Sequence, residues 1–104
     1  MLIQSSALSA ESDIHAAKFW QSHCKKSDMV CIGYLQALLD INNASRENGE
    51  HVRWCAPLVV RLDDIRLTIL REMKAKPERL SIPFINFAMK ALETAYPCLD
   101  DLAK

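Results

Sequence analysis

Glycine is scarce in this sequence: only Gly33 and Gly49 occur among 104 residues. An all-β domain of this size needs more glycine for its tight turns, so the scarcity favours helices. The length allows one hydrophobic core and therefore one domain. The sequence predicts an all-α fold, a small bundle of about four helices over residues 11–104. Residues 1–10 are expected to be a frayed N-terminus or the remnant of a signal peptide, because residues 7–10 (ALSA) look like the end of one.

The four cysteines, Cys24, Cys31, Cys55 and Cys98, are the second informative count. Their number is even, and no pair has the C-x-x-C spacing of zinc ribbons or thioredoxin-like sites. In a small neutral domain such cysteines favour two disulfides and an oxidising compartment such as the periplasm. The alternative is four buried free thiols in a cytosolic protein.

Four segments have helical periodicity, at residues 11–24, 28–42, 62–76 and 82–96. Ser9 or Ser12, Ser27 and Ser81 are the expected caps of the first, second and fourth segments. The second segment is apolar almost all round, which predicts a central helix that is buried on several sides. Gly33 lies inside it, and we expect another backbone to approach closely there.

A polar connection of twelve residues follows the second helix, at residues 43–54. This is long for a connection between packed helices, and long connections are either functional or mobile. Cys55 is expected to fix its far end.

The residues offer little support for catalysis or for a cofactor. A thiol nucleophile would be Cys31 with His51 or His15 as its base, but a disulfide at Cys31 explains that residue better. His15, His23 and Cys24 lack the spacing of a metal site. Asp63 and Asp64 begin a helix, where acids complement the helix dipole. We therefore expect no enzyme, no metal and no cofactor.

The charge balance also limits the partners. Thirteen basic and thirteen acidic side chains give a formal net charge of zero, which disfavours bulk attraction to nucleic acid or an anionic membrane. No apolar run reaches the ~18–20 residues that a membrane span requires. A rigid helical scaffold with one charged loop is typical of a binding module.

Several short motifs together resemble a known family. Cys31-x-Gly33-Tyr34-Leu35 opens the second helix and Asp40 lies near its end. The others are Trp54-Cys55-x-Pro57, Pro77 and Ala91-Leu92-x-x-Ala95-Tyr96-Pro97-Cys98. Their order and spacing resemble the Tai family of type VI secretion amidase immunity proteins, also called resistance-associated proteins. The resemblance spans about residues 20–98.

That resemblance implies an all-α, periplasmic homodimer that performs no chemistry. Its partner would be a cognate secreted peptidoglycan amidase, a cysteine hydrolase, whose active-site cleft the immunity protein occludes. This protects the producer from intoxication by a sister cell. The alternatives are a disulfide-stapled periplasmic adaptor or chaperone without a toxin partner and, more remotely, a thiol enzyme that uses Cys31.

We predict that the disulfides pair Cys24 with Cys98 and Cys31 with Cys55. This pairing joins the ends of the first and fourth helices and fixes the long connection to the second helix.

The inhibitory surface is expected on the charged loop, defined as residues 45–54, because a cleft for an anionic cell-wall peptide should be positive. Trp54 is either a contact residue or packs against the Cys31–Cys55 bridge, and Lys76-Pro77-Glu78-Arg79 is the alternative surface. The predicted partner-binding residues are Arg46, Glu47, Asn48, Glu50, His51, Arg53 and Trp54.

Overall fold

The computed structural model describes residues 13–57 and 59–99, which form four α-helices and one short 3-10 helix. The helices are α2 (Ala17–Lys26), α3 (Met29–Glu47), α4 (Leu62–Ala75) and α5 (Phe84–Ala95), with η2 (Pro77–Arg79) between the last two. No strand forms among the described residues. The predicted all-α class and small bundle are confirmed. The proposed helix caps Ser9 and Ser12 lie outside the described residues.

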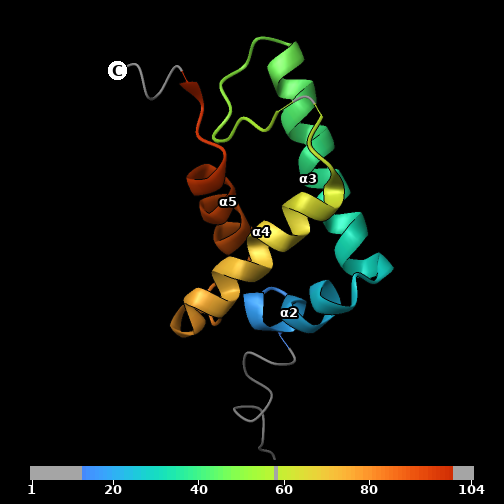
Figure 1. Cartoon of the computed structure of the whole chain (residues 1–104), viewed down its shortest axis with the longest axis vertical. Helices are drawn as coiled ribbons and strands as arrows, with labels where there is room; N and C mark the ends of the chain where they lie inside the picture. The colour runs from blue at the N-terminus through green and yellow to red at the C-terminus, as the bar shows by residue number, and fades with distance from the viewer. Residues whose placement is uncertain (1–12, 58, 100–104) are drawn as a thin grey trace, which may run out of the picture.

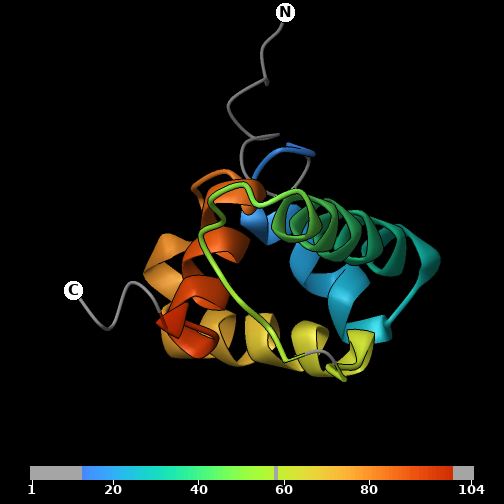
Figure 2. The same ribbon diagram turned by 90° about the horizontal axis from the view of Figure 1, so that it is seen from above.

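Helices α2 and α4 each pack against the three other α-helices, whereas α3 makes most of its helix contacts with α2 and α4. Figure 2 shows α4 along one side of the bundle and α3 along the opposite side. The stripe of Ile65, Ile69 and Met73 on α4 is fully buried. The core also contains Leu35 of α3, Trp54, and Phe84, Phe87 and Leu92 of α5. The sequence-based expectation that residues 28–42 form the central helix is therefore wrong.

Helix α3 lies at the side of the bundle and keeps much of its apolar surface in solvent. Met29 is 79% exposed and Ile41 is 66% exposed, whereas Cys31, Leu35 and Asn42 are buried. Gly33 is exposed, and a β-carbon added there would meet nothing within 4 Å. The expected close approach of another backbone at Gly33 is also wrong. The apolar residues around the first half of α3 did not mean burial on every face.

The starts of the helices are stabilised differently from the expected serine caps. Asp28, and not Ser27, caps α3: its Oδ1 accepts hydrogen bonds from the amides of Val30 (3.1 Å) and Cys31 (3.2 Å). Ser27 instead takes the left-handed conformation that ends α2. The short turn between α2 and α3 thus uses one residue to stop a helix and the next to start another.

Helices α2 and α5 begin beside each other and bond through their backbones. The amide of Ala17 donates to the carbonyl of Ile82 (2.9 Å), and the amide of Phe84 donates to the carbonyl of His15 (2.6 Å). Neither helix has a side-chain cap, so Ser81 does not serve as one. Backbone hydrogen bonds between the two segments thus satisfy amides at the helix starts that a serine side chain would otherwise satisfy.

The disulfides join Cys24 to Cys31 and Cys55 to Cys98, with Cα–Cα distances of 5.1 and 4.9 Å. Two disulfides were expected, but the predicted pairing is wrong. The end of α2 and the end of α5 lie at opposite ends of the molecule, so Cys24 and Cys98 are far apart (Figure 1). The Cys24–Cys31 bridge instead closes the α2–α3 turn, and the Cys55–Cys98 bridge joins the segment after Trp54 to the segment after α5.

None of the described helices is both long enough and apolar enough to cross a membrane.

Candidate functional site

The charged loop begins inside helix α3. Residues 43–47 are helical, although the sequence analysis assigned them to the connection, and α3 ends at Glu47. Gly49 has a φ of +76°, and its amide donates to the carbonyl of Arg46 (3.0 Å). The amide of Glu50 then donates to the carbonyl of Ser45 (2.9 Å). These bonds end the helix and reverse the chain, which is why glycine suits position 49.

The far end of the loop is anchored in the core. The Trp54 side chain is 1% exposed and its carbonyl accepts a hydrogen bond from Nδ2 of Asn42 (3.0 Å). The amide of Cys55 donates to the carbonyl of Tyr96 (2.8 Å), and Cys55 is bonded to Cys98. Trp54 therefore supports the loop from within, beside the Cys55–Cys98 bridge.

Two arginines attach the rest of the loop to the body of the protein. Nη1 of Arg46 donates to the carbonyl of Ala56 (2.9 Å), and Nε of Arg53 pairs with a carboxylate oxygen of Glu93 on α5. These contacts hold the loop on both sides of its turn. The charged loop is thus a defined surface feature and not a loose connection.

The outer surface of the loop consists of polar side chains. Of the predicted partner-binding residues, all but Trp54 are exposed: Arg46, Glu47, Asn48, Glu50, His51 and Arg53. Arg46 and Arg53 make bonds within the protein. Glu47 and Glu50, at the tip of the loop, make no ion pair within the described chain. The loop offers two free carboxylates beside a tight turn.

The charged loop crosses the end of the bundle from α3 towards α5 and on to α4 (Figure 2). Two hollows adjoin this loop. One, of about 320 Å³, is bordered by Arg46, Glu50, His51 and the Cys55–Cys98 bridge. The other, of about 410 Å³, is mostly apolar and lies between α3, the loop and α5. Its apolar lining consists of Leu38, Ile41, Val52, Trp54, Ile85 and Met89.

The other candidates from the sequence do not assemble into a reactive centre in the described part of the chain. Cys31 is bonded to Cys24, so it has no thiol to act as a nucleophile. No group of three or more potential metal ligands occurs among the described residues. Asp63 pairs with Arg66 at 2.7 Å in the first turn of α4, which fits its expected role at the helix start.

His23 takes part in a local hydrogen bond with Asp28 and in no group of metal ligands among the described residues. Its Nδ1 lies 2.6 Å from Oδ2 of Asp28, the residue that caps α3. The hydrogen bond from His23, together with the amide hydrogen bonds, holds the pKa of the Asp28 carboxyl below its usual value, although partial desolvation opposes this effect.

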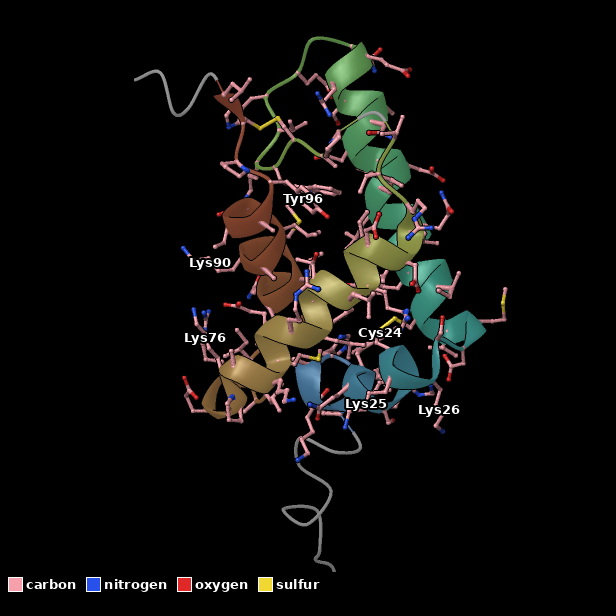
Figure 3. The ribbon with its side chains drawn as sticks, viewed as in Figure 1. Cys24, Lys25, Lys26, Lys76, Lys90 and Tyr96 are labelled. Atoms are coloured by element: carbon pink, nitrogen blue, oxygen red, sulfur yellow. A yellow bond between two sulfur atoms is a disulfide. The ribbon has the colours of Figure 1, made fainter. Side chains whose placement is uncertain are left out.

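The alternative surface, Lys76-Pro77-Glu78-Arg79, lies at the end of α4, and the side chain of Lys76 is labelled there in Figure 3. Nζ of Lys76 pairs with Glu72 at 2.9 Å, and the Arg79 guanidinium lies 6.0 Å from the centre of the Phe87 ring. Both cations are therefore engaged by the protein itself.

Sequence reasoning missed the two residues that position the charged loop. Glu93 gave no signal, because its pairing with Arg53 depends on how α5 packs. Asn42 did give a signal in the sequence, because it lies seven residues after the buried Leu35, on the same apolar helix face. A polar side chain on such a face needs a buried hydrogen-bond partner.

Comparison with known proteins gives one match. The family model of the Rap1a immunity proteins matches residues 8–98, which is most of the chain. No curated protein and no solved structure matches the chain significantly. The match covers all four helices, both disulfides and the charged loop. The chain therefore belongs to the Rap1a family of type VI secretion immunity proteins.

Proposed function

We propose that this protein neutralises a cognate type VI secreted peptidoglycan amidase in the periplasm by occluding its active-site cleft. Membership of an immunity family carries the proposal, since such proteins act by binding an effector and not by catalysis. The two disulfides support an oxidising compartment. The choice of an amidase rests on the motif resemblance around Cys31, Trp54 and Tyr96.

The charged loop is the proposed contact surface. A cleft that accepts an anionic cell-wall peptide should carry positive potential, and Glu47 and Glu50 offer carboxylates to it. The anchors at Asn42, Arg46 and Arg53 support this assignment, because a loop that is already ordered loses little entropy on binding. Trp54 would act by holding the loop in shape, because its side chain is buried.

The experiment is to express a type VI peptidoglycan amidase from the same bacterium, directed to the periplasm, with and without this protein. We expect lysis without it, growth with it, and co-purification of the two chains. The purified protein should also reduce peptidoglycan hydrolysis at a one-to-one ratio. A hydrolase that does not bind, together with general rescue of unrelated misfolded periplasmic proteins, would favour the adaptor or chaperone alternative.

We further propose that the protein acts as a homodimer, as the resemblance implies. The exposed apolar side chains of α3 and α5, Val30, Ile41 and Ile85, support such an interface. Sedimentation at micromolar concentration should then give a mass near twice 11.8 kDa. Ile41→Glu should shift the protein to monomer. A single species near 11.8 kDa for the unmodified chain would contradict the dimer.

A further inference from the structure

A third hollow lies between α2 and α4, and α2 is at the end of the molecule opposite the charged loop (Figure 1). It has a volume of about 410 Å³, and its exposed lining is mostly apolar. We call it the basic groove, and its residues are Gln21, Lys25, Leu67, Leu70, Arg71 and Lys74. Leu67 is 38% exposed in it and contributes apolar surface among charged side chains.

The cations of the groove have no acidic partners in the described chain. Helix α2 contains no acid at all. Every acid of α4 pairs with another cation: Asp63 with Arg66, Asp64 with Arg61, and Glu72 with Lys76. Lys25 and Lys74 make no ion pair with a described residue, and Arg71 contacts only the hydroxyl of Thr68, at 3.4 Å. The groove is therefore locally positive although the chain is neutral.

We propose that the basic groove binds an acidic, amphipathic segment of a partner protein. An apolar side chain of that segment would rest on Leu67 and Leu70, and its flanking carboxylates would pair with Lys25, Arg71 and Lys74. Charge complementarity identifies the partner as anionic, and the apolar floor requires an apolar side chain between the charges. A helical partner segment with leucines and acids at helical spacing supplies both the carboxylates and the apolar side chain.

The shape of the surface favours a protein segment over a lipid bilayer. A bilayer is bound best by apolar side chains that project from a surface, with cations around them. Here the exposed leucine lines a hollow between two helices, which a protruding side chain of a partner can fill. Helix α2, which borders the groove, and the charged loop lie at opposite ends of the bundle, so one molecule has room for an effector at the loop and a second partner at the groove (Figure 1). The proposal does not depend on the proposed function.

The experiment uses the full chain and a synthetic amphipathic peptide with leucines at i, i+3 and i+7 and glutamates between them. In an NMR titration we expect the shift changes to be confined to the amides of α2 and α4 around the groove. Affinity should fall about tenfold when the salt rises from about 0.05 to 0.5 M, because salt screens exposed charges. A peptide with lysine in place of glutamate should not bind.

Matched charge reversals assign the binding to the groove. Lys25→Glu/Lys74→Glu should weaken binding of the acidic peptide at least about tenfold, since attraction becomes repulsion. Lys26→Glu/Lys90→Glu changes the net charge equally, but neither residue lines the groove, so this control should weaken binding clearly less than the groove variant does. Lys26 adjoins Lys25 at the end of α2, and Lys90 extends from α5 away from α2 (Figure 3).

Three results would overturn the proposal. The first is no binding of the acidic peptide, and the second is equal loss of affinity in the two double variants. The third is binding of vesicles with about 30% phosphatidylglycerol through Lys25 and Lys74 while the peptide does not bind, which would make the groove a membrane contact. Protection against the hydrolase is measured separately, so failure of the groove proposal leaves the immunity function untouched.

Discussion

Asn42 of α3 donates a buried hydrogen bond of 3.0 Å from its side-chain Nδ2 to the backbone carbonyl of Trp54. This bond connects the last third of a helix to the segment that returns from the charged loop. The Trp54 carbonyl lies outside any helix or sheet, so the Asn42 side chain supplies its hydrogen-bond donor. The same bond fixes the backbone just before the Cys55–Cys98 bridge. One amide thus couples the core to the proposed binding surface.

Asn42→Ala should destabilise the fold by about 1–3 kcal/mol, because it leaves the Trp54 carbonyl buried without a partner. Asn43→Ala is the control, since Asn43 is the exposed neighbour on the same helix. The free energy of unfolding from urea titrations measures both. Equal stability of the two variants would mean that water replaces the Asn42 amide.

The two disulfides should differ in their contribution to stability. The Cys24–Cys31 bridge closes a separation of 7 residues and the Cys55–Cys98 bridge one of 43. The chain-entropy model assigns about 2.5 kcal/mol to the first and about 4 kcal/mol to the second. Replacing each pair by alanine should reproduce that order in urea unfolding. Non-reducing peptide mapping should release a Cys24–Cys31 peptide, and a Cys24–Cys98 peptide would contradict the fold.

Gly33→Ala should stabilise the protein by up to about 1 kcal/mol. Alanine has the higher helix propensity, and the added methyl group points into open space. Thermal unfolding with the two variants side by side is the measurement. Gly49→Ala is a useful contrast, because its φ of +76° should make the same change destabilising. A loss of stability at Gly33 would indicate that a partner or second copy approaches that face.

Stability should fall in acid partly through Asp28. The hydrogen bond from His23 lowers the pKa of this carboxyl in the folded state relative to the unfolded chain. Its stabilising contribution is therefore complete above the ordinary aspartate pKa and disappears as the pH falls through the lowered folded value. Asp28→Ser keeps an oxygen at the cap and removes the titration, so stability should depend less on pH between about pH 2 and 5. An unchanged slope would exclude Asp28 as a contributor.

Glu47→Ala/Glu50→Ala should fold normally and lose inhibition of the cognate hydrolase. Charge pairs removed from an interface typically cost about 2–5 kcal/mol of binding free energy. Residual hydrolase activity at increasing inhibitor concentration measures the effect. Glu78→Ala is the matched change on the alternative surface at the end of α4, and it should inhibit like the unmodified protein. The reverse result would move the contact surface to η2.

Local features of the sequence predicted local features of the fold. The segment 62–76 was predicted as a helix and α4 spans Leu62–Ala75, because its apolar stripe, its initial acids and Pro77 act within a few residues. The scarcity of glycine and the even number of cysteines similarly predicted an all-α domain with two disulfides. These signals depend on neighbours along the chain, so they can be read without knowing how the helices pack.

Tertiary packing alone decided which helix faces are buried, which cysteines pair and which charges gather. The first half of α3 is apolar almost all round, yet only its contacts with α2 and α4 determine which face is buried. Lys25 and Lys74 are far apart in sequence, so nothing local marks the basic groove. Likewise Asn42 meets Trp54, and Arg53 meets Glu93, only because the chain reverses at Gly49 and α5 lies beside the returning segment. Periodicity specifies which residues share a helix face, whereas the partner of each face depends on the packing of the whole chain.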